Sequence, residues 1–93
     1  MTEGGESPSD GAGSVPSLRD LLTFLARSLV EHPDKVEIAE LEESDAIVFE
    51  IRVAESDLGR IIGRQGRTAK ALRTVMSAAS AKMRRRVIVD IIE

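Results

Sequence analysis

The segment GRQG at residues 63–66 has the residue types and spacing of a phosphate-binding loop. Glycine at each end permits positive φ angles and lets another backbone approach without a Cβ in the way. Amides in such a loop, and at the start of the helix that we expect to begin near Arg67 or Thr68, are unpaired N–H donors that suit a phosphate. The pattern GxxG also occurs by chance in many proteins, so its surroundings must decide the interpretation.

The surroundings of this segment are strongly basic. Residues 58–86 contain nine Lys or Arg and no Asp or Glu, whereas the other 64 residues contain all 16 acids and four bases. The net charge of −3 therefore combines a block of +9 with a remainder of −12, and this asymmetry favours an anionic partner. A solvated helix face, or a corner between helices that needs glycine only for its geometry, is the alternative interpretation. The cations closest to the loop in sequence are Arg60, Arg64, Arg67 and Lys70.

Composition disfavours other kinds of site. The chain has no Cys, which excludes a disulfide, Cys-ligated zinc and a thiol nucleophile, and its single His excludes a multi-His metal site. No plausible nucleophile, base and orienting group converge from the residue types present. The glycine spacing fits neither the phosphate loop of nucleotide hydrolases nor a Rossmann motif. We therefore expect no enzyme activity, no catalytic residues, no metal and no cofactor.

Residues 1–16 differ in composition from the rest of the chain. They hold four of the seven Gly and two of the three Pro, with Ser, acids and few apolar residues. Such a stretch cannot bury a core, so we expect a disordered Gly/Ser/acidic tail followed by one domain at residues 17–93. No apolar run approaches the length of a membrane span, and Met1 is not followed by a signal sequence. We expect a cytoplasmic protein without membrane contact.

The elements that hold the loop begin with a helix at Ser17, whose side chain is expected to cap it. Apolar residues recur at helical spacing from Leu18 to Val30, and Pro33 ends the helix. His32, at this boundary, is expected to end the helix or fill a turn rather than to bind a ligand.

Two strands and a polar hairpin follow this helix. A short alternating run begins at Val36, and a clearer alternation at residues 46–53 predicts a half-buried strand. The carboxylates between the two runs are expected to form a solvated turn rather than an acid/base or metal site: Glu42, Glu43 and Asp45.

The loop itself joins two expected helices. The short one is opened by Ser56 and Asp57, as cap and first-turn acid. The longer one leads to a strand at Val87–Ile92, which is apolar at nearly every position and is expected to have little exposure. The Ala- and Ser-rich stretch at 77–81 indicates close packing against a neighbour. The inner face of the longer helix is expected to comprise Ala69, Leu72, Val75, Met76, Ala79 and Met83.

The expected element order is helix, strand, strand, helix, helix, strand. The helical connection before the last strand is long enough for a crossover, so we expect that strand to run parallel to the one at 46–53. This predicts an α+β fold with a three-stranded mixed sheet and three helices on one face. A domain of this size has a small core, which favours self-association or a partner.

The segment VAESDLGRIIGRQGRTAKALRT, at residues 53–74, resembles the core of a K-homology (KH) domain, in which GxxG links two helices of a β-α-α-β unit. The extra helix and strand lie N-terminal to that unit, which resembles the type II arrangement. With SLVEHPDKVEI and the SAAS segment, the resemblance to small bacterial KH-domain RNA-binding proteins covers about four-fifths of the chain. The tail is not part of that pattern.

This resemblance implies binding of single-stranded RNA. Phosphates would pass over the glycine loop, and bases would lie in an aliphatic groove, with Ile61 or Ile62 as a contact and the other in the core. Because the chain has no Tyr or Trp, base stacking is largely unavailable, and binding should be weak and electrostatic. The implied RNA-binding residues are Gly63, Arg64, Gln65, Gly66, Arg60, Arg67, Lys70, Ile61 and Ile62.

The same resemblance implies a role as an RNA chaperone or post-transcriptional regulator, linked to cell elongation and cell-wall homeostasis. The implied protein partner is a second KH-containing protein of the KhpB, Jag or EloR type, or a second copy of this chain. The alternative is a scaffold, in which the KH fold serves chiefly for dimerisation and has little intrinsic RNA binding.

Overall fold

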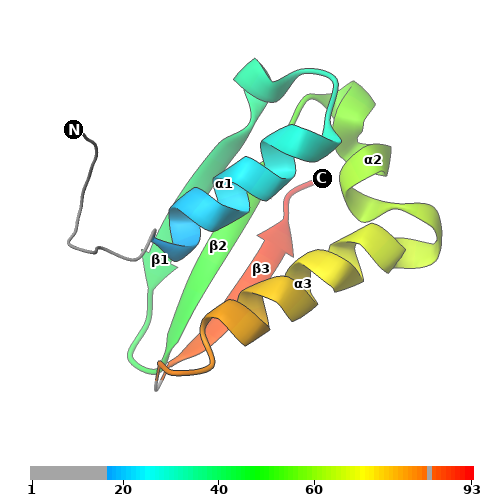
Figure 1. The fold of residues 1–93 in the computed structure, drawn as a ribbon. Coiled ribbons are helices and arrows are strands. Elements are labelled where there is room, and N and C mark those ends of the chain that lie inside the picture. The colour runs from blue at the N-terminus through cyan, green and yellow to red at the C-terminus, as the bar shows by residue number, and fades with distance from the viewer. Residues whose placement is uncertain (1–16, 84) are drawn as a thin grey trace, which may run out of the picture.

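The computed structural model describes residues 17–83 and 85–93. The expectation of a disordered tail at residues 1–16 concerns a segment outside the described residues. Within them, one layer of helices packs on a sheet (Figure 1). The helices and strands are α1 (Leu18–Leu29), β1 (Glu37–Glu42), β2 (Ala46–Arg52), α2 (Leu58–Ile62), α3 (Arg67–Ala79) and β3 (Arg86–Ile91).

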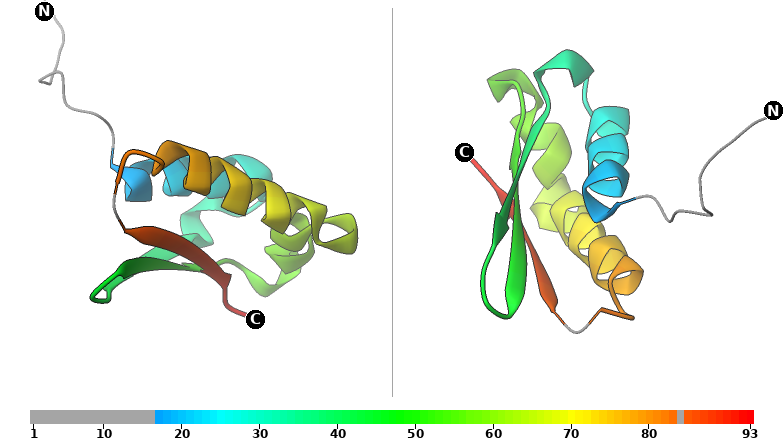
Figure 2. Two further views of the ribbon diagram at one scale, coloured as in Figure 1. Left: turned by 90° about the horizontal axis from the view of Figure 1, so that it is seen from below. Right: turned by 90° about the vertical axis from the view of Figure 1, so that its left-hand side faces the viewer.

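The sheet has the strand order β1-β2-β3, with β2 in the centre. β1 pairs with β2 antiparallel, and β2 pairs with β3 parallel. α2 and α3 form the crossover between the parallel strands, and the helices cover one face of the sheet (Figure 2). The predicted α+β fold, with its α-β-β-α-α-β order and mixed sheet, is therefore confirmed. Of the helices in the described part of the chain, none is long and apolar enough to cross a membrane.

The core lies between the helices and the inner face of β2. The strand alternates as predicted, so that Phe49 and Ile51 point under the helices and are buried. α1 contributes Leu22, which is also fully buried. Ser17 caps this helix as predicted, because its Oγ accepts a hydrogen bond of 3.0 Å from the amide of Asp20. α1 is thus stabilised by the Ser17 cap at its start and by the burial of its apolar residues.

The predicted inner face of α3 is only partly correct. Val75 and Met83 are 41% and 42% exposed, and Ala79 is exposed as well. Val75 is about 60° around the helix from Leu72, the nearest buried residue, Ala79 is the last residue of the helix, and Met83 lies beyond its end. One narrow stripe suffices because the strand that α3 packs on is β3, at the edge of the sheet. The buried members of the predicted face are Ala69, Leu72 and Met76.

β3 and the stretch at residues 77–81 are more exposed than expected. Val89 is the one buried residue of β3, and Ser80 is the one buried residue of the stretch. β3 is an edge strand, and the helices cover only one face of the sheet. The expectation of little exposure for β3 is therefore only partly correct, since its apolar residues other than Val89 are half-buried, and an apolar run does not distinguish a central strand from an edge strand.

Candidate nucleic-acid interface

The glycine loop turns the chain between α2 and α3 with three positive φ angles in four residues. These angles are 78° at Gly63, 58° at Gln65 and 74° at Gly66. Gly63 also has a ψ of 171°, a region essentially restricted to glycine, and a Cβ there would lie 2.2 Å from Thr68 Oγ1. At Gly66 a Cβ would have nothing within 4 Å. Gly63 is thus required by conformation and by space, and Gly66 by conformation alone.

Part of the hydrogen-bonding capacity of the loop is already used internally. The amide of Gly66 donates to the carbonyl of Gly63 at 3.1 Å, and the amide of Gly63 donates to the carbonyl of Gly59 at 2.8 Å. The amide of Arg67, at the start of α3, donates to the carbonyl of Arg64. A phosphate on the loop would therefore depend on the exposed side chains and on the amides between the two glycines.

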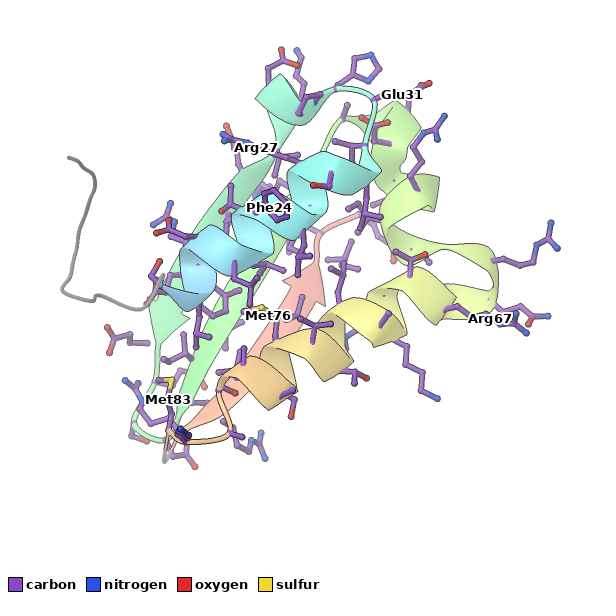
Figure 3. All side chains as sticks on the ribbon, viewed as in Figure 1. Phe24, Arg27, Glu31, Arg67, Met76 and Met83 are labelled. Atoms are coloured by element: carbon purple, nitrogen blue, oxygen red, sulfur yellow. The ribbon has the colours of Figure 1, made fainter. Side chains whose placement is uncertain are left out.

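The tip of the loop is polar, exposed and cationic. Arg64, Gln65 and Arg67 are all exposed, and Arg67 Nη2 donates to Gln65 Oε1 at 3.2 Å. Figure 3 shows Arg67 at the outer end of the loop, pointing away from the body of the domain. Lys70 is exposed one turn further along α3. The structure thus brings these predicted residues to one end of the molecule, and no ion pair joins them to a carboxylate among the described residues.

Arg60 is the predicted cation that the structure places elsewhere. Its Nη2 lies 3.1 Å from Glu31 Oε2, and its Nε lies 3.6 Å from Asp57 Oδ1. The side chain is half exposed, but two carboxylates partly neutralise it. Arg60 therefore adds less positive potential at the loop than its position in the sequence indicates.

The two isoleucines of α2 separate into a core residue and a candidate contact residue. Ile61 is fully buried and belongs to the hydrophobic core. Ile62 is half-buried and directly precedes Gly63. Ile62 is thus the one of the pair that a base beside the loop could touch, while Ile61 holds α2 on the sheet.

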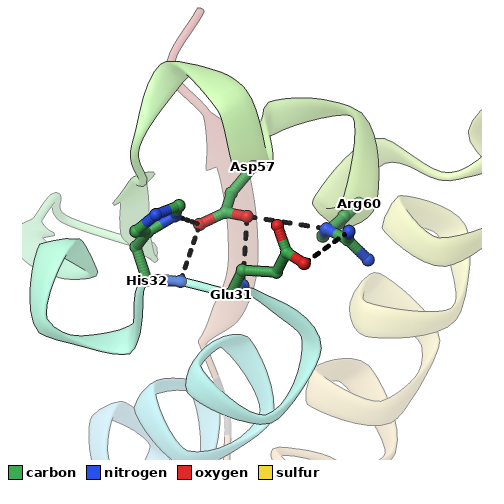
Figure 4. A network of polar contacts seen from close by, with 4 residues as sticks. All are labelled: Glu31, His32, Asp57 and Arg60. Carbon is green, nitrogen blue, oxygen red and sulfur yellow. Dashed lines mark hydrogen bonds and ion pairs between the residues drawn. The ribbon is translucent and has the colours of Figure 1, made fainter.

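A buried carboxylate that the sequence analysis misassigned anchors the other end of α2 (Figure 4). Asp57 was expected as a first-turn acid, but it is fully buried and makes no helix-capping hydrogen bond. Its Oδ1 accepts from the amide of Glu31 at 3.0 Å, and its Oδ2 accepts from the amide of His32 at 3.0 Å. The His32 ring nitrogen Nδ1 lies 3.0 Å from the same Oδ2. Asp57 therefore ties α2 to the segment that follows α1, and His32, which lies in the turn after α1, is one of its partners.

The environment of Asp57 keeps its carboxylate ionised. Burial acts to raise the pKa of Asp57, but the hydrogen bonds from the Glu31 amide and from the ring and amide of His32 outweigh it and lower the pKa below its ordinary value. Within the described residues, no three His, Cys, Asp or Glu side chains are grouped so that they could hold a metal. The hydrogen bonds and charges of Asp57 join it to the segment after α1.

The fold and the loop together define a class of protein. A β-α-α-β unit with GxxG between its helices, preceded by a helix and an antiparallel strand, is a type II KH domain. A family model described as KhpA/KhpB, KH domain, matches residues 19–91, and the chain belongs to this family.

Curated relatives of similar length support the assignment. The RNA-binding protein KhpA of Clostridium acetobutylicum is 47% identical over 75 residues, which cover 81% of this chain and 100% of the relative. The RNA-binding protein KhpA of Aquifex aeolicus is 42% identical over 79 residues, covering 85% and 100%. The protein of the same name from Chlamydia caviae is 36% identical over 76 residues, covering 82% and 97%.

A solved structure supports the fold alone. A crystal structure of Aquifex aeolicus Era bound to GDP and aluminium fluoride is similar to this chain, with a TM-score of 0.61 and 20% sequence identity. The similarity covers 98% of this chain and 36% of Era. The same fold thus occurs as part of a much longer chain.

Proposed function

We propose that this protein binds single-stranded RNA through its glycine loop. The observation that carries the proposal is the exposed tip formed by Arg64, Gln65 and Arg67, which lies in a block without acids and carries no carboxylate partner among the described residues. The curated relatives are named RNA-binding proteins, which supports the same ligand.

In this proposal the loop holds the backbone of the RNA and the adjacent groove holds its bases. Phosphates contact the tip of the loop, where Arg64, Arg67 and Lys70 supply positive charge and the amides between the glycines supply donors. The bases turn toward Ile62 and the edge of the sheet. Since the chain lacks Tyr and Trp, aromatic stacking adds little, and the affinity depends strongly on salt.

Reversing the charge of the loop tests this proposal. The double variant Arg64→Asp, Gln65→Asp puts two carboxylates at the phosphate position and leaves both glycines in place. Contact with about three phosphates gives a salt slope near −2, so wild-type affinity for an oligouridine should fall about 10- to 20-fold between 50 and 200 mM salt. The double variant should lose most binding even at 50 mM salt, as measured by fluorescence anisotropy.

A matched control separates the loop from overall charge. The variant Lys35→Asp, Ala39→Asp changes the net charge by the same amount at two exposed positions, one before β1 and one within it. It should bind the oligouridine nearly as well as the wild type. Circular dichroism should show that both double variants are folded. A folded loop variant that keeps its affinity would refute the loop as the RNA site and favour the scaffold alternative.

We also propose a protein partner and a cellular role for the RNA-binding domain. An apolar groove of about 230 Å³ between α1 and α3, lined in part by Leu25, Leu29 and Val75, supports contact with a second KH-containing chain. The family description joins KhpA with KhpB, which supports a KH-containing partner of the KhpB, Jag or EloR type, and a homodimer is the alternative. The role is that of a cytoplasmic RNA chaperone or post-transcriptional regulator in cell elongation and cell-wall homeostasis. Sedimentation of the chain, alone and with such a partner, tests the association.

A further inference from the structure

Arg73 connects α3 to the edge of the sheet beside the glycine loop. Its Nε donates a hydrogen bond of 3.2 Å to the carbonyl oxygen of Val89 on β3. β3 is an outer strand of the sheet, so the guanidinium lies over the seam between α3 and that edge. Six residues separate Arg73 from Arg67, the first residue of α3, which places the two about 9 Å apart along the helix axis.

The helix side of the seam carries positive charge, whereas β3 carries one exposed acid, Asp90. Lys70 and Arg73 are three residues apart and share one face of α3, and Gly66 at the N-cap lies four residues before Lys70. Past them, the seam opens into a pocket of about 410 Å³ whose lining includes Ser77 and Arg86. A strand of RNA that leaves the loop along this face therefore stays beside cations and meets no acid of the same helix.

The guanidinium of Arg73 is fixed in position but still has donors to offer. Its Nε is used by Val89, while no acceptor for its Nη1 or Nη2 is found among residues 17–83 and 85–93. Arg60 and Arg85 differ, because carboxylates occupy them: Glu31 for Arg60 and Glu42 for Arg85. Arg73 thus presents a planar fork that can only donate hydrogen bonds.

Such a fork suits bases that have two adjacent acceptors. Guanine offers O6 and N7, and cytosine offers O2 and N3 on its Watson–Crick edge, which proteins read in single-stranded RNA. On its Watson–Crick and Hoogsteen edges adenine instead places the N6 donor beside an acceptor, and uracil places N3–H between its two acceptors, which opposes the guanidinium N–H groups. Building on the proposed RNA binding, we infer that Arg73 selects guanine or cytosine at one position of the bound RNA.

The test compares three RNA octamers: an oligouridine, and the same octamer with one central cytosine or one central guanine. The wild type should bind at least one of the substituted octamers about fivefold or more tightly than the oligouridine. Arg73→Lys keeps the charge and the salt slope but removes the fork, so its affinities for the three octamers should agree within about twofold. Whether cytosine or guanine gives the larger gain identifies the base.

Two further variants complete the design. Arg27→Lys removes a fork from an exposed position on α1, near the opposite edge of the sheet (Figure 3), and should keep the wild-type preference. Arg73→Gln replaces the fork with a side chain that pairs with adenine N6 and N7, so the preference should shift toward an octamer with a central adenine. A purely structural role of Arg73 would lower the melting temperature and leave the preference unchanged.

The outcomes separate this inference from the proposed function. If the wild type binds all octamers equally, or if folded Arg73→Lys keeps the preference, the selective role of Arg73 is refuted. RNA binding through the loop still stands in that case, provided that the loop variant Arg64→Asp, Gln65→Asp loses binding. If the wild type binds none of the octamers, both proposals are refuted.

Discussion

The two ends of α2 are held in opposite ways. At its start, the fully buried Asp57 accepts hydrogen bonds from the segment after α1, and Ile61 is packed in the core. At its end, the chain passes through Gly63 into an exposed loop. A helix of five residues is not stable alone. The anchored end therefore supplies the stability that lets the other end keep its polar side chains exposed.

The arginines of the basic block show the same contrast. Arg85 Nη1 lies 2.9 Å from Glu42 Oε1, and its Nη2 donates to the carbonyl of Ala46 at 3.2 Å, so this side chain fastens the β1–β2 hairpin. Arg64 and Arg67 carry no such pairs with acids among the described residues. The formal charge of the block therefore overstates the positive surface that an anion can use.

The largest effect should come from adding a methyl group at the exposed end. In Gly63→Ala the Cβ would overlap Thr68, including its backbone nitrogen at 2.8 Å, in a conformation with a φ of +78°. We expect a loss of about 3 kcal/mol or more in the free energy of unfolding, measured by urea denaturation. Gly59→Ala is the matched control, because a Cβ there meets nothing within 4 Å and alanine favours a helix. Equal stabilities of the two variants would contradict the described loop geometry.

A smaller effect is expected from loss of charge at the anchored end. Asp57→Asn keeps the shape of the side chain but cannot accept hydrogen bonds on both sides as a carboxylate does. The melting temperature at pH 7 should fall by about 5 to 10 °C. The exposed Asp34 provides the control, since Asp34→Asn should change the melting temperature by only a degree or two. An unchanged melting temperature in Asp57→Asn would show that the anchor is not electrostatic.

Because the pKa of Asp57 is lowered, the stability difference between the wild type and Asp57→Asn should depend on pH. Because the folded state binds the proton of Asp57 less tightly than the unfolded state, the stabilisation is complete above the unfolded pKa of about 3.9. It is lost as the pH falls through the lower folded pKa. The difference in melting temperature between wild type and Asp57→Asn should therefore shrink below about pH 4.

The smallest effect on stability should come from Gly66→Ala. This residue has a φ of +74°, but the space around a Cβ is open. We expect a cost of about 1 kcal/mol from the left-handed conformation alone. Gly66→Asn should cost less than Gly66→Ala, because Asn tolerates this conformation better. An equal loss in the free energy of unfolding for Gly66→Ala and Gly63→Ala would contradict the role given to Thr68, which crowds only Gly63.

The elements that form the site can be predicted from the sequence better than the long-range contacts that hold those elements in place. The order of elements, the parallel last strand and the exposed loop follow from local periodicity and from glycine spacing. The role of Asp57 does not, because it depends on contact with Glu31 and His32, some 25 residues earlier in the chain. A carboxylate beside a short helix has the same local pattern whether it is exposed or buried. The positive φ of Gln65 is likewise set by the closure of the loop and not by its residue type.

The parallel pairing of β2 and β3 has a consequence for the order of events during synthesis. Ile47 pairs with Val87, 40 residues later in the chain, and the glycine loop lies inside that connection. Closing so long a connection is slow compared with forming the β1–β2 hairpin. On a ribosome, the hairpin can therefore form first, while the proposed RNA site is assembled only after β3 has left the exit tunnel. The nascent chain would thus gain its ligand affinity late, when nearly the whole domain has already been made.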